Sequence, residues 1–154
     1  ALIKLREMRS EEGKKLAEDI AMRCDLLKNH IEEIEKYSSS VVEDYREKLN
    51  LRISELLDDP SIIDENRLAQ EVAIYADKSS ITEEIVRFKS HIGQLKNTIF
   101  KDDSIGRKID FLIQEMNRET NTIGSKANDM GMTNIVINIK NLLEKIREQV
   151  QNIE

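Results

Sequence analysis

Two glutamates one helical turn apart, Glu115 and Glu119, have the clearest capacity for chemistry in this sequence. Residues four positions apart share one face of a helix, so the two carboxylates could hold a single divalent cation. Oxygen ligands suit Mg²⁺ or Mn²⁺, and we therefore predict a metal site that contains both glutamates. The alternative is a structural role, in which both carboxylates form salt bridges with Arg118 and nearby lysines.

A second segment supplies Glu84, Arg87 and His91, which are three and four positions apart and share one helix face. If this segment runs antiparallel to the helix that contains Glu115, the three side chains face its carboxylates. We predict that Glu84 is a further metal ligand, that Arg87 binds an anion and that His91 assists catalysis. A histidine with apolar neighbours is also typical of a partly buried packing residue, and that alternative remains open.

The polar stretch at 106–128, GRKIDFLIQEMNRETNTIGSKAN, is too varied for an ordinary solvent-exposed helix face. Asparagine and threonine are poor helix formers, so their presence within a helix indicates side chains that bind something. A polar interface between subunits is the alternative interpretation. Four basic residues outnumber three acidic ones in this stretch, and we predict that they bind phosphates: Arg107, Lys108, Arg118 and Lys126.

Several familiar sites are absent from the sequence. It contains no phosphate-binding glycine loop, no paired cysteines, no HExxH pattern and no glycine-flanked serine nucleophile. The six aromatic residues fall mainly on or beside apolar stripes, so a stacking platform for bases is not expected. Any contact with nucleic acid would then be made through phosphates.

Apolar residues recur at steps of three and four along most of the chain, which is typical of amphipathic helices. Only 39% of residues are hydrophobic and 35% are charged, with one proline and five glycines, so the apolar stripes are narrow. We predict an all-α fold of about five long amphipathic helices, which form antiparallel hairpins in one elongated domain over residues 1–154.

Polar and glycine-containing segments predict where these helices begin and end. The first helix is expected to start near Ser10 and to break at 38–40, where Ser40 and Glu43 form a capping box for the second. The next predicted boundaries are a stop at 58–60, a start at Asp64, an interruption at 79–80 and a loop at 101–104. The fourth helix is expected to end near Gly131, and a short glycine turn joins it antiparallel to the last helix, which Thr133 caps.

Charge and cysteine content limit the partners and the compartment. The chain has 24 basic and 30 acidic residues, and its net charge of -6 would repel a polyanion except where basic residues are locally concentrated. General coating of DNA is not expected. The single cysteine and the absence of an apolar run near 20 residues predict a cytoplasmic protein without a membrane span.

The strings that follow resemble the C-terminal domain of the YicC/YloC-type bacterial endoribonuclease family. The resemblance extends over MRSEEGKKL (8–16), RLAQEVAIYADK (67–78) and ITEEIVRFKSHI (81–92), and it is densest in the segments at 106–128 and 144–154. It implies a bacterial cytoplasmic protein in which this helical part follows a separate N-terminal domain. It also implies hexameric assembly and metal-dependent cleavage within RNA.

Together, the residues and the resemblance predict a metal-dependent endoribonuclease that takes RNA as its partner and Mg²⁺ or Mn²⁺ as its cofactor. Glu115, Glu119 and His91 are the predicted catalytic residues, with Glu84, Glu115 and Glu119 as metal ligands. The predicted RNA-binding residues are Arg87, Arg107, Lys108, Arg118 and Lys126. The competing hypothesis is a noncatalytic helical scaffold that oligomerises and presents the active site of an N-terminal domain.

Overall fold

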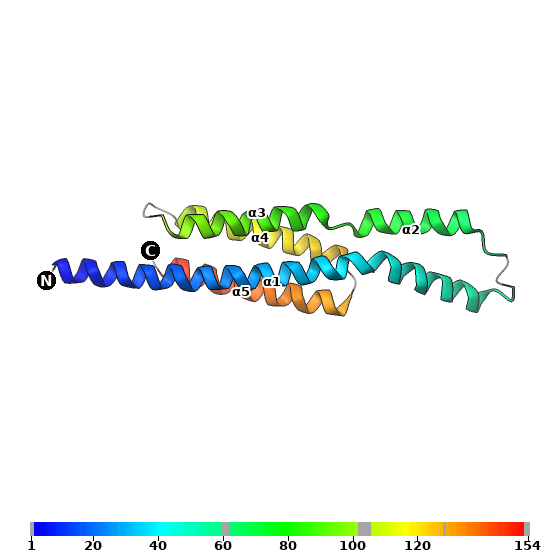
Figure 1. Ribbon diagram of the computed structural model, residues 1–154, viewed down its shortest axis with the longest axis horizontal. Helices are drawn as coiled ribbons and strands as arrows, with labels where there is room; N and C mark the ends of the chain where they lie inside the picture. Colours follow the sequence, from blue (N-terminus) through cyan, green and yellow to red (C-terminus); the bar gives the residue numbers. More distant parts are fainter. Residues whose placement is uncertain (1, 60–61, 102–105, 128, 153–154) are drawn as a thin grey trace.

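The computed structural model describes residues 2–59, 62–101, 106–127 and 129–152, and within these ranges it is all α-helical. A first helix of 55 residues is followed by four shorter ones. Their bounds are α1 (Leu2–Leu56), α2 (Glu65–Ser79), α3 (Thr82–Ile99), α4 (Gly106–Lys126) and α5 (Met130–Gln151). The prediction of an all-α, elongated fold is confirmed (Figure 1).

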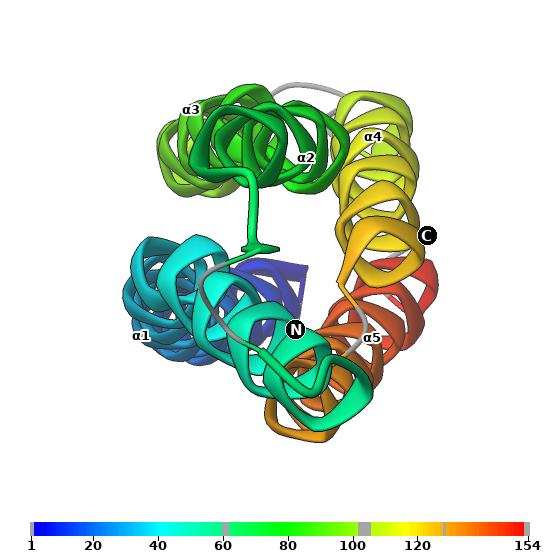
Figure 2. The same cartoon turned by 90° about the vertical axis from the view of Figure 1, so that its right-hand side faces the viewer.

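Four of the helices form a bundle in which each helix runs antiparallel to its two neighbours. The ring order is α1, α3, α4, α5, and α5 returns to contact α1 (Figure 2). The predicted antiparallel pairing of the last two helices is confirmed. Antiparallel neighbours with short connections are typical of up-and-down helix bundles.

The bundle core consists of the apolar stripes that the sequence pattern predicts. The stripe of α3 is buried along its whole length, with Phe88 and Leu95 fully enclosed. The other three helices contribute matching fully buried side chains: Ile20, Cys24, Leu27, Ile31, Ile34, Ile109, Met116, Ile123, Ile139, Leu143 and Ile146. Burial raises the pKa of Cys24 to about 11, so its thiol stays protonated and packs as a small apolar side chain.

The C-terminal end of α1 extends beyond the bundle and pairs with α2, and we call this two-helix extension the arm (Figure 1). Its apolar contacts are sparse, because Leu68 and Val72 are the buried residues of α2. Leu51, Leu56 and Ile74 are exposed on it. The arm therefore has little core of its own, and its shape depends on the continuity of α1.

The predicted break at 38–40 is wrong, because α1 continues through the serine run without interruption. Each serine hydroxyl donates to the backbone carbonyl three residues earlier, on Glu35, Lys36 or Tyr37. These bonds satisfy the hydroxyls within the helix, so the serines need not act as caps. The expected start at Ser10 is also wrong, since α1 begins at Leu2.

The cap of the last helix differs from the prediction as well. Asp129, not Thr133, is the N-cap of α5, and its carboxylate accepts a hydrogen bond from the Gly131 amide at 2.9 Å. The predicted end of the fourth helix near Gly131 is wrong, because α4 ends at Lys126 and Gly131 lies inside α5.

The other predicted boundaries agree with the structure where it describes them. Helix α1 ends at Leu56, shortly before the expected stop. The predicted cap at Asp64 and the predicted interruption between α2 and α3 are confirmed. Most of the predicted loop at 101–104 lies outside the described residues, as does position 60.

None of the helices described is both long enough and apolar enough to cross a membrane.

Candidate functional site

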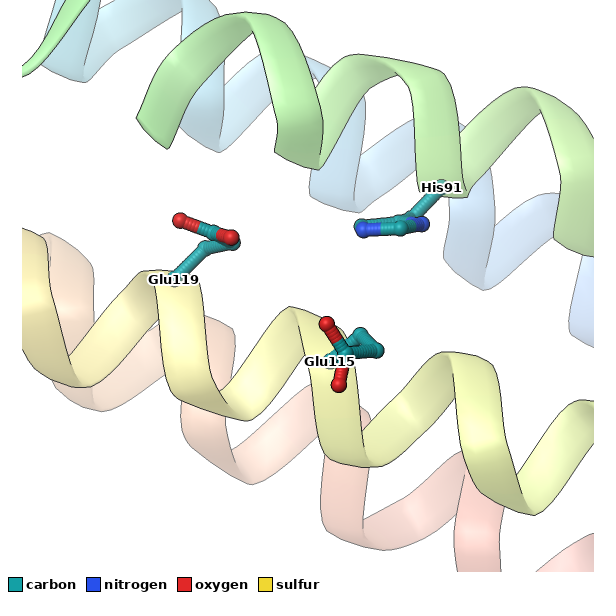
Figure 3. A group of neighbouring side chains, drawn as sticks. All are labelled: His91, Glu115 and Glu119. Carbon is teal, nitrogen blue, oxygen red and sulfur yellow. The ribbon is translucent and has the colours of Figure 1, made fainter. Parts of the chain in front are cut away.

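The seam between α3 and α4 brings together three of the predicted catalytic residues. His91 on α3 faces Glu115 and Glu119 on α4 (Figure 3). One nitrogen of the imidazole and one oxygen of each carboxylate all lie within 4.8 Å of one another. The antiparallel packing of the two helices, expected from their short connection, is what makes these positions meet.

The three side chains suit a divalent cation. Donor atoms bound to one ion with bonds of about 2.1 Å are at most ~4.2 Å apart, and these three donor atoms lie within 4.8 Å of one another. The Nδ1 atom of His91 is buried, and no side chain or backbone group in the described part of the chain forms a hydrogen bond with it. An imidazole nitrogen and two carboxylate oxygens are a donor set that suits a divalent cation.

Arg87 holds one of these carboxylates in place. Its Nε atom lies 3.0 Å from Oε1 of Glu119, whose side chain is only 8% exposed. The same guanidinium is 3.7 Å from the exposed Glu83 on its own helix. A buried carboxylate is costly unless it is paired, and the Arg87 pair offsets the cost of placing the Glu119 carboxylate inside the seam. The structure thus places Arg87 as a partner of Glu119.

Glu84, the other predicted metal ligand, lies one helical turn from Arg87 and pairs with a different residue. Nζ of Lys126 donates to its Oε1 at 2.9 Å and to the Ser80 carbonyl at 3.1 Å. The structure therefore groups Glu84 with Lys126 at the end of the seam and leaves it out of the group around His91. Lys126, predicted as a phosphate ligand, keeps at most one free donor.

The Glu84 carboxylate is predicted to stabilise the fold in a pH-dependent way. Burial raises its pKa, but the hydrogen bond from Lys126 and the nearby positive charges lower it more, so the pKa lies below the usual value of 4.5. A carboxyl group whose pKa is lower in the folded than in the unfolded protein stabilises the fold at pH values above its unfolded-state pKa. This stabilisation is lost as the pH falls through the folded-state pKa. Glu84→Gln should lower the free energy of unfolding at pH 7 by about 1–3 kcal/mol.

Denaturant titrations between pH 7 and pH 3 measure this effect, with the exposed neighbour Glu83→Gln as the matched control. The difference between parent and Glu84→Gln should shrink below about pH 4. A difference that stays constant over the whole range would show that the ion pair does not contribute to the pH dependence.

Three of the predicted phosphate ligands are free for contact with a polyanion. Arg107, Lys108 and Arg118 are exposed on α4, and each lacks an ion pair with the residues that the structure describes. Arg107 also lines a cavity of about 140 Å³ between the start of α4 and the end of α5, together with Arg147 and Asp110. These exposed cations form a surface beside the seam, and we call it the α4 basic surface.

Sequence reasoning missed a pair of stacked tyrosines. Tyr45 on α1 and Tyr75 on α2 lie with ring centroids 3.8 Å apart and an interplanar angle of 9°. They line a second, larger cavity where the arm meets the bundle. The pairing of α1 with α2 brings the two rings together, and apolar spacing along a single helix does not report such a pair.

Fold and site together define an elongated α-helical bundle with a carboxylate and histidine group suited to a hard divalent cation. The sequence profile described as "Endoribonuclease YicC-like, C-terminal" matches residues 34–154. The chain belongs to this family.

Two curated relatives are similar over almost the whole chain. One, from Clostridioides difficile (strain 630), is named "Probable endoribonuclease YicC" and is 92% identical over 154 residues, which are 100% of this chain and 53% of the relative. The other, with the same name and from Haemophilus influenzae (strain ATCC 51907 / DSM 11121 / KW20 / Rd), is 34% identical over 147 residues, or 96% of this chain and 50% of the relative. The chain therefore spans about half the length of the curated relatives it matches.

Proposed function

We propose that the full-length protein is a metal-dependent endoribonuclease and that this chain supplies the helical domain with the metal ligands. The observation that carries the proposal is the meeting of His91, Glu115 and Glu119 in the α3–α4 seam. The family membership and the names of the relatives give the reaction class, because both are described as endoribonucleases.

Each residue of the seam has a distinct role in this proposal. Glu115 and Glu119 hold Mg²⁺ or Mn²⁺, and His91 completes the ligand set or exchanges a proton with the reacting water. A cation bound there would lower the pKa of a water molecule and offset charge on the scissile phosphate. Arg87 positions the Glu119 carboxylate through their 3.0 Å ion pair. The α4 basic surface binds neighbouring phosphates of the RNA.

The second candidate is a noncatalytic scaffold that presents the active site of another domain. One observation favours it: the Arg87 pair already satisfies the buried Glu119 carboxylate without a metal ion. The two candidates differ in what they require of the carboxylates. A scaffold needs the shape and charge balance of the seam, whereas an endoribonuclease needs its affinity for a cation.

A gel assay with end-labelled single-stranded RNA tests the proposal, using the full-length protein and this chain side by side. The full-length protein should cut within the strand, stop when a chelator is added and recover when Mn²⁺ or Mg²⁺ is restored. Cleavage that continues in chelator would contradict the metal dependence. The absence of cleavage over a range of RNA sequences and both metals would contradict the endoribonuclease function.

We also propose that the protein is a cytoplasmic homo-oligomer, a hexamer by its family resemblance. The exposed apolar residues of the arm, Leu51, Leu56 and Ile74, give a physical reason for association, since a paired surface would remove them from water. Light scattering on the full-length protein should give a mass near six times that of one subunit. A monomeric mass at micromolar concentration would contradict the oligomer.

A further inference from the structure

A cavity of about 440 Å³ lies where the arm leaves the four-helix bundle. Its walls come from the middle of α1, the end of α2 and the connection between α4 and α5, which lie side by side at this point (Figures 1 and 2). Cavities of about 300–1,000 Å³ are the usual size for small organic ligands. No residue of the α3–α4 metal group lines it.

The walls combine a flat aromatic surface with apolar side chains. Tyr45 and Tyr75 are already stacked on one another, so their rings are held in place before any ligand arrives. Both are partly exposed, and Val41, Ile81 and Met132 add apolar surface beside them. A preformed ring stack with an apolar surround suits a planar heterocycle, because stacking on an ordered ring costs little conformational entropy.

The charges in the cavity favour a base over a phosphate. Lys48 and Lys126 line it, but Asp44 and Asp129 line it too, so the positive charges are balanced. The ammonium of Lys126 is also paired with Glu84. Carboxylate oxygens accept hydrogen bonds from exocyclic amino groups, such as N4 of cytosine or N6 of adenine. The Asp129 carboxylate uses Oδ1 for the Gly131 amide, which leaves its other oxygen for such a contact.

We propose that this cavity receives one unpaired base of the RNA, which stacks on the tyrosine pair. The inference rests on the proposed endoribonuclease function and extends it from cleavage to base recognition. Lys126, on the cavity wall, is seven residues from Glu119, which is about 10 Å along α4. Seven residues is two helical turns, so the cavity and the metal group lie along the same side of α4. The recognised base therefore belongs to a nucleotide near the one that is cut, and single-stranded segments with unstacked bases are the expected substrates.

The test measures affinity of the full-length protein for a fluorescently labelled single-stranded RNA, in chelator so that the strand stays intact. Tyr45→Leu should weaken binding by about tenfold through loss of stacking, without changing the salt dependence. Tyr45→Phe keeps the ring and should bind within about twofold of the parent. The matched control is Phe100→Leu, which removes an exposed aromatic side chain at the end of α3, outside the cavity wall.

A series of RNAs with one abasic nucleotide at successive positions identifies the base itself. The parent should lose about tenfold in affinity at one position, and Tyr45→Leu should lose nothing further there, because the variant has already lost the stacking that the abasic nucleotide removes. Equal affinity of Tyr45→Leu and Phe100→Leu, or an abasic effect that is the same in parent and Tyr45→Leu, would overturn the proposal. This outcome is distinct from failure of the proposed function, which would appear as absence of metal-dependent cleavage while the affinity series can still be read.

Discussion

Glu119→Gln in the full-length protein is expected to reduce metal-dependent RNA cleavage by at least about 100-fold, and Glu115→Gln should do the same. Glutamine keeps the size and helix propensity of glutamate but removes the charge that a hard cation requires. The Glu119 carboxylate is nearly buried in the seam, so solvent cannot replace it as a ligand in the same position. Cleavage rates over a titration of Mn²⁺ measure the loss.

The control is Glu144→Gln, which removes an exposed carboxylate from α5, away from the seam. It should cut RNA at the parent rate. Circular dichroism and unfolding by denaturant must show that each variant retains its helices, because Glu119 also pairs with Arg87. If folded Glu115→Gln and Glu119→Gln both cut at the parent rate over the whole titration, the metal site is wrong and the scaffold becomes the better hypothesis.

Neutralising the α4 basic surface is expected to give the largest change in RNA affinity. Replacing Arg107, Lys108 and Arg118 by alanine should weaken binding of single-stranded RNA by about 100-fold at low salt. A plot of log affinity against log salt concentration becomes less steep by about 0.7 for each phosphate-binding cation that is removed. Its slope should therefore become shallower by roughly 2 in the triple variant. Fluorescence anisotropy at several salt concentrations measures both quantities.

A triple variant of α1 separates local binding from net charge. Lys14, Lys28 and Lys36 are exposed, and alanine at these positions changes the net charge by the same amount. This variant should retain most of the affinity and the parent salt dependence. Equal losses in the two triple variants would show that overall charge, and not the α4 basic surface, governs binding. Lys126 is left unchanged in both, since its ion pair with Glu84 joins α3 to α4.

The sequence by itself determined the helical class and the core. Apolar residues at steps of three and four form one stripe on each helix, and burial of those stripes leaves few other arrangements for them. Phe88, Met116 and Leu143 all lie in the core for this reason. The spacing of Glu115 and Glu119 likewise determined that they share a face, because that relation depends only on helix periodicity.

The tertiary structure decided which polar groups meet across helices. The sequence pattern places Glu84, Arg87 and His91 on one face. Across the seam, however, Glu84 pairs with Lys126, Arg87 pairs with Glu119, and His91 lies beside both Glu115 and Glu119. The continuity of α1 was also decided there, because packing along one side of a long helix outweighs the weak preference of serine for helix ends. Stacking of Tyr45 on Tyr75 was decided there too, because it follows from the pairing of α1 with α2. Local propensities act over a few residues, whereas these interactions join residues far apart in the chain, and only the packed helices set the distances between them.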